Sequence, residues 1–168
     1  GKLDVLTKKL EKAIAEDPEN VDLYVTLGET YYTISQYHNT QFILNENNIS
    51  EGMPLINAKA KFGEPTNEET LTEEGKPVKR LYYGKTYLDF VDDKLKSWHV
   101  KVDDGIDHAA KAKEFREKSI AQYDKSLKMT DDKELEYLLN DKIGTILFNA
   151  GVDIYNKSVS IRDDEKAK

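Results

Sequence analysis

The chain has 168 residues, of which 38% are hydrophobic and 34% are charged, and it contains no cysteine. This composition suffices for one or two small domains, and it excludes disulfide frameworks, thiolate metal sites and cysteine nucleophiles. No apolar run approaches the roughly 20 residues that a membrane-spanning helix needs. The net charge of −7 and the pI near 5.1 argue against nucleic acid as a partner.

An apolar stripe predicts a first helix from about Asp4 to Glu16. Pro18 follows it and would break a continuing helix, because proline loses a backbone hydrogen bond and clashes with the preceding turn. Asp17 and Asn20 are typical turn and cap residues. The residues of the stripe recur at helical spacing: Leu3, Leu6, Leu10, Ala13 and Ile14.

A second helix is predicted over residues 21–36. Its apolar residues share one face and are Val21, Tyr24, Leu27, Gly28 and Tyr31. A glycine inside a helix costs roughly 1 kcal/mol relative to alanine. Gly28 therefore predicts a neighbouring helix that comes too close for a side chain.

From about Tyr37 to Asp104 the periodicity indicates an inserted α/β module. A short helix is expected within it, with Ser50 or Gly52 as its N-terminal cap, Pro54 in its first turn and Gly63 as its C-terminal cap. Its buried face would consist of Leu55, Ala58 and Phe62. The glutamate-rich segment 66–76 is predicted to be an exposed loop. Three strands in a meander should follow, joined by short turns: Val78–Tyr83, Thr86–Val91 and Leu95–Val102.

The helical period returns after Gly105. A helix from about Ile106 to Lys128 is marked by Ala112, Phe115, Ser119, Tyr123 and Leu127. A last helix over about 133–158 carries Leu135, Leu138, Leu139, Ile143, Ile146, Leu147, Ala150 and Ile154.

The helical segments resemble the tetratricopeptide repeat. Tyr24-x-x-Leu27-Gly28-x-x-Tyr31 after the Asp17-Pro18 turn matches its core pattern, and Ile143-Gly144-x-x-Leu147 repeats part of it. The resemblance implies stacked helix pairs. It assigns inter-helix packing to Tyr24, Leu27, Gly28, Tyr31, Ile143, Gly144 and Leu147. The helix order begins and stops in half repeats, so the chain is expected to be either a fragment of a longer array or a closed four-helix bundle.

The middle segment is similar to the small outer-membrane lipoprotein A and β-lactamase-inhibitor-like modules. The residues that carry this likeness are Ile49-x-x-Gly52-Met53, Phe62-Gly63-x-Pro65 and Leu88-x-Phe90-x-Asp92-Asp93-x-Leu95. Those modules belong to bacterial envelope proteins and bind other proteins without catalysis. The likeness implies a periplasmic or envelope location, and the start at Gly1 leaves room for a removed targeting segment.

These observations predict an α+β fold of two parts. Residues 1–36 and 106–168 would form a discontinuous domain of four tetratricopeptide-like helices, and residues 37–105 the insert with one helix and a three-stranded antiparallel meander. The apolar stripes of helices 21–36 and 106–128 should pack antiparallel, because each lacks another partner. The ends of the insert would then meet, bringing His38 close to His108.

No group of residues indicates catalysis. The three histidines His38, His99 and His108 match no metal signature, and no nucleophile elbow, phosphate loop or dinucleotide motif occurs. We therefore expect no enzyme activity and no cofactor. Trp98 and His99 alternate on the predicted strand Leu95–Val102, and the tryptophan is expected to face the core.

The aromatic residues of the meander favour an interface instead. Tyrosine and tryptophan are enriched at protein interfaces, and the candidate partner-binding residues are Tyr82, Tyr83, Tyr87 and Trp98, of which half could form the core face of the sheet. The favoured function is a non-catalytic scaffold that binds another protein or peptide. The alternative is a small-ligand module with a pocket between the insert and the helices. The oligomeric state stays open.

Overall fold

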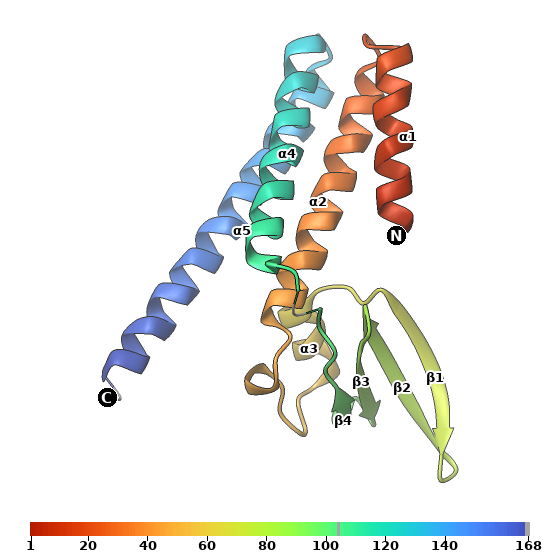
Figure 1. Cartoon of the computed structure of the whole chain (residues 1–168), viewed down its shortest axis with the longest axis vertical. Helices are drawn as coiled ribbons and strands as arrows, with labels where there is room; N and C mark the ends of the chain where they lie inside the picture. The colour runs from red at the N-terminus through yellow and green to blue at the C-terminus, as the bar shows by residue number, and fades with distance from the viewer. Residues whose placement is uncertain (104, 167–168) are drawn as a thin grey trace. The chain divides into compact units, whose positions relative to one another are not determined.

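A computed structural model describes residues 1–103 and 105–166, with side chains up to residue 152. This part of the chain holds five α-helices and one four-stranded antiparallel sheet (Figure 1), which confirms the predicted α+β class. The chain divides into two compact units. The first joins Gly1–Tyr32 to Phe115–Lys168, and the second is Thr33–Glu114.

Four helices contribute to the first unit: α1 (Lys2–Glu16), α2 (Val21–Ile43), α4 (His108–Met129) and α5 (Lys133–Lys166). The unit takes α2 up to Tyr32 and α4 from Phe115. The turn between α1 and α2 forms as predicted: the backbone N–H of Asn20 donates to the Asp17 carbonyl. Tyr24 strengthens this turn, because its hydroxyl donates to the Pro18 carbonyl at 2.7 Å.

Gly28 lies at a close crossing of α2 and α4. A Cβ added there would lie 2.6 Å from Cε1 of Tyr123, whose side chain is only 1% exposed. Ser119 Oγ donates to the Gly28 carbonyl at 2.7 Å, and the rings of Tyr31 and Phe115 lie 5.8 Å apart. Later residues of α2 meet earlier residues of α4, so the predicted antiparallel packing is confirmed within this unit.

The packing assigned to α5 is corrected in part. Leu139 and Ile146 form a buried cluster with Tyr123, and Ile143 packs against it. Leu147, however, is 56% exposed, and a Cβ added at Gly144 would meet nothing within 4 Å. The likeness to the Leu-Gly-x-x-Tyr pattern therefore placed Leu147 and Gly144 in a contact that the described part of the chain does not make. The predicted position Ile154 lies outside the residues whose side chains are described.

The second unit contains α3 (Leu55–Phe62) and a sheet in the order β1-β2-β3-β4. Its strands are β1 (Asn67–Glu73), β2 (Lys76–Tyr83), β3 (Thr86–Val91) and β4 (Lys94–His99). The prediction of three strands was wrong, because the polar segment expected to be a loop is the edge strand β1. Its side chains are mostly exposed, so β1 carries little of the apolar alternation that marks a strand.

Tight turns with positive φ join the strands. Glu74 and Gly75 have φ of 49° and 77°, and Asp92 and Asp93 have φ of 49° and 59°. Two consecutive residues with positive φ form the type I′ turn, whose twist suits a two-residue hairpin. The turn at Glu74 and Gly75 therefore favours a hairpin of β1 with β2, although the sequence of β1 has little of the apolar alternation of a strand.

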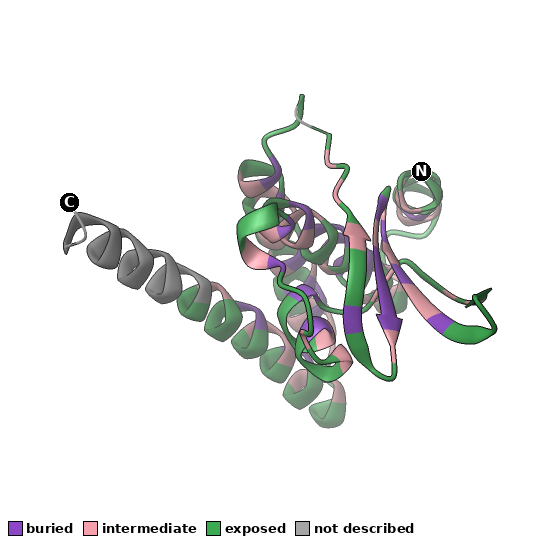
Figure 2. Ribbon diagram, turned by 90° about the horizontal axis from the view of Figure 1, so that it is seen from below, coloured by how far each residue is buried: buried purple, intermediate pink, exposed green. Residues whose placement is uncertain are grey.

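The core of this unit lies between α3 and one face of the sheet. It is made of Leu44, Ile49, Ala58, Phe62, Leu81, Tyr83, Leu88, Phe90 and Leu95. Figure 2 shows buried residues in purple along the central strands. The second helix does not end near residue 36 as predicted but continues to Ile43. Tertiary contacts hold its last turns, since Thr40 donates to the Phe62 carbonyl and Gln41 to the Tyr83 carbonyl.

Candidate protein-interaction surface

The sheet face opposite the α3 core carries a set of aromatic and charged residues. Leu81 pairs with Leu88, and both belong to the core. Because neighbouring residues of a strand point to opposite faces, the flanking cross-strand pairs lie on the other face. We call this surface the tyrosine face, and it consists of Glu69, Arg80, Tyr82, Tyr87, Asp89, Ser97 and His99.

A bidentate ion pair lies at the centre of the tyrosine face. Arg80 Nε donates to Asp89 Oδ1 at 2.7 Å, and its Nη2 donates to Oδ2 at 2.8 Å. These hydrogen bonds hold the pKa of Arg80 above its ordinary value. The guanidinium also stacks on the Tyr87 ring, 4.0 Å from its centroid. A planar cation held on two sides fixes the neighbouring ring in place.

Aromatic rings extend from this ion pair across the strands. The Tyr87 ring lies 6.2 Å from that of Tyr82 in an edge-to-face arrangement and 5.5 Å from that of His99. The Tyr82 hydroxyl donates to Glu69 Oε1 at 2.8 Å. Tyr82 and Tyr87 are half-buried and His99 is exposed. The result is a row of three rings, in which the Tyr82 hydroxyl is oriented by Glu69 and the Tyr87 ring by Arg80.

Two of the predicted interface residues lie elsewhere. Tyr83 is 1% exposed, packs in the core and donates its hydroxyl to the Gly63 carbonyl at 2.9 Å. Burial raises its pKa. Tyr83 is therefore a core residue and is not available to a partner. Trp98 packs partly against the core, as expected from its alternation with His99, and its Nε1 donates to Glu46 at 2.8 Å.

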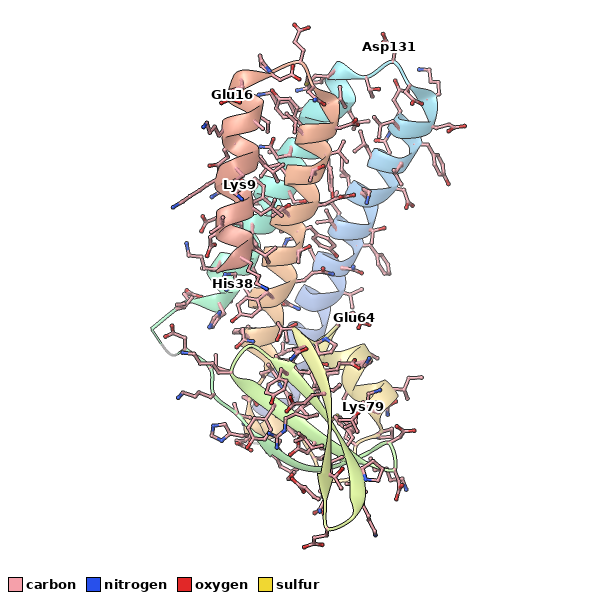
Figure 3. All side chains as sticks on the ribbon, turned by 90° about the vertical axis from the view of Figure 1, so that its right-hand side faces the viewer. Lys9, Glu16, His38, Glu64, Lys79 and Asp131 are labelled. Carbon is pink, nitrogen blue, oxygen red and sulfur yellow. The ribbon has the colours of Figure 1, made fainter. Side chains whose placement is uncertain are left out.

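The proximity predicted for His38 and His108 is confirmed. Their Nδ1 atoms lie 2.9 Å apart, and His108 is buried (Figure 3 labels His38). Among the described residues, none hydrogen-bonds to Nε2 of His108. An unpaired lone pair is less costly to bury than an unpaired N–H, which favours the tautomer in which His108 Nδ1–H donates to His38. The pair has no third ligand for a metal, since no group of three or more metal-ligating side chains occurs among the described residues.

The glutamates of β1 hold structural partners. Glu68 accepts from Lys59 and lies 3.8 Å from Lys79. The hydrogen bond from Lys59 lowers the pKa of Glu68, which is the opposite of what a general acid needs at neutral pH. These contacts tie the edge strand to α3 and to β2.

Sequence reasoning did not find the Arg80–Asp89 pair. The two-residue loop Gly84–Lys85 could have revealed it, since such a loop determines which residues of the hairpin lie opposite each other. Counting outward from this loop along both strands pairs Tyr82 with Tyr87 and Arg80 with Asp89. The chemistry of each residue alone did not distinguish this arginine from a solvated one.

Among the helices that the structure describes, none is both long enough and apolar enough to cross a membrane. Comparison with protein-family models, curated proteins and solved structures found no match to this chain.

Proposed function

We propose that the chain is a non-catalytic protein-interaction scaffold of the bacterial envelope. In this proposal tetratricopeptide-like helices carry a module similar to the outer-membrane lipoprotein A and β-lactamase-inhibitor-like domains. The observation that supports it best is the tyrosine face, where Tyr82, Tyr87 and His99 are held in a row beside the Arg80–Asp89 ion pair.

The chemistry of this face suits a protein or peptide surface. Tyrosines offer a large contact area with few rotatable bonds, so binding them costs little side-chain entropy. The Arg80 charge is already paired with Asp89. The face therefore offers aromatic area and hydrogen-bonding tips without an uncompensated cation for phosphate groups, which agrees with the acidic net charge of the chain.

Site-specific photocrosslinking tests this proposal. A photoreactive residue at His99 would report on the tyrosine face, and the same residue at Ile56 would serve as control. Ile56 lies on α3 and, like His99, is exposed, but it is not part of the tyrosine face. We expect the His99 probe to capture one defined protein from a bacterial envelope fraction, and the Ile56 probe to capture none.

A second test removes the ring of Tyr87, which is the central ring of the row. Tyr87→Ala should abolish capture by the His99 probe and leave the circular dichroism spectrum unchanged, because Tyr87 lies outside the α3 core. Equal capture from both positions, or capture that survives Tyr87→Ala, would contradict the proposal.

A further inference from the structure

Helix α5 carries an outer stripe that no other described residue of its unit covers. Tyr137 and Phe148 are 78% and 71% exposed. A Cβ added at Gly144 or Gly151 would meet no atom of the described residues within 4 Å. Large apolar side chains that are exposed on one helix face, with small residues between them, favour an interaction site. The residues recur at spacings of three and four, and we call them the α5 stripe: Glu134, Tyr137, Asp141, Gly144, Phe148 and Gly151.

The crossing of α2 and α4 in the same unit shows how a neighbouring helix packs against a glycine on a helix face. On α2, Gly28 receives the Tyr123 ring and the Ser119 hydroxyl of α4, so a second helix lies directly against the glycine. The α5 stripe has exposed glycines like the one at this crossing, but no described helix of its unit lies on it. Its occupant should therefore be another helix.

Helix α1 has an outer stripe of opposite charge. Val5 is 55% exposed, and Leu6 beside it is also exposed. The α1 stripe recurs at the same spacings and consists of Lys2, Val5, Lys9, Lys12 and Glu16. Figure 3 labels Lys9 and Glu16 on this helix. Lys2 and Lys9 flank Val5, and Lys12 follows with its Nζ 3.8 Å from Glu16 Oε1, whereas Glu134 and Asp141 are the charged members of the α5 stripe.

We propose that the α1 stripe of a second copy of this chain docks on the α5 stripe. Val5 of the α1 stripe would pack against the aromatic residues of the α5 stripe, and the lysines of α1 would lie against Glu134 and Asp141. The two stripes are different surfaces of one chain, so the contact is head-to-tail and each added copy presents a new free end. This assembly is independent of the tyrosine face.

Complementary blocking variants test the proposal. Val5→Glu with Lys9→Glu blocks the α1 stripe, and Phe148→Glu blocks the α5 stripe. All three side chains are exposed, so we expect each variant to fold, with an unchanged circular dichroism spectrum as the check. The mass of each species is measured by sedimentation over a wide range of concentration.

The unmodified chain should grow in mass continuously with concentration, and less so at high salt, because exposed ion pairs are screened. Each variant alone should stay monomeric. An equimolar mixture of the two should form a species of two chains and no larger one, because only one compatible contact remains. An unmodified chain that stays monomeric throughout, or a mixture that fails to pair, would overturn the proposal.

Discussion

Substitution of Gly28 by alanine tests whether α2 and α4 cross as closely as described. The new Cβ would lie 2.6 Å and 2.8 Å from two carbons of the Tyr123 ring. Carbon atoms in good contact are about 3.5–4.0 Å apart. The ring cannot simply rotate into solvent, because Tyr123 is buried against Leu139 and Ile146. Either the ring or the helix must move.

Two opposing effects set the magnitude. Alanine is the better helix former by roughly 1 kcal/mol, and overpacking a well-filled core costs about 1–3 kcal/mol. We expect Gly28→Ala to lower the free energy of unfolding by about 1 kcal/mol. Gly144→Ala is the matched control, since it places the same methyl group in open space on α5. It should raise stability by up to about 1 kcal/mol.

Urea denaturation followed by circular dichroism, at a dilution where copies do not associate, measures both variants. The Tyr123→Leu background adds a direct test of the cause. Without the ring, Gly28→Ala should become neutral or stabilising, which gives a coupling energy between positions 28 and 123 of about 1 kcal/mol or more. If Gly28→Ala and Gly144→Ala change stability with the same sign and size, the close crossing is refuted.

Three further outcomes are expected from contacts in the two units. Asp93→Gly should stabilise the β3–β4 hairpin by about 0.5–1 kcal/mol in thermal unfolding, because φ of 59° is unstrained for glycine; a lower melting temperature would contradict this. Asp89→Ala should destabilise by roughly 1.5–3 kcal/mol in urea titrations, because Arg80 loses two charge-assisted hydrogen bonds; a neutral result would show that Arg80 does not depend on them. Burial raises the pKa of Tyr31 and of Tyr123 to about 12. The unfolded chain ionises its tyrosines near pH 10, so the free energy of unfolding should fall as pH rises from about 10 to about 12. The absorbance of tyrosinate should show some tyrosines that ionise later than the rest. Uniform titration near pH 10 would refute the burial of Tyr31 and Tyr123.

The sequence by itself determined the elements whose signals are local. Pro18 and the apolar period located the first two helices, and the glycine at position 28 predicted a crossing that is present. The alternation of Trp98 and His99 predicted which of them meets the core. These inferences hold because proline, glycine and side-chain periodicity act on the backbone within a few residues of themselves.

Only the tertiary structure decided the features that depend on partners distant in the sequence. The strand β1 is polar and forms because it pairs along its length with β2. The end of α2 is held by the Phe62 and Tyr83 carbonyls rather than by its own propensity. Gly28 and Gly144 stand in similar sequence patterns, yet a neighbouring ring meets the first and open space surrounds the second. A residue's own sequence neighbourhood does not encode which other segment will lie against it, and that contact determines whether a glycine packs, a tyrosine is buried or an arginine is paired.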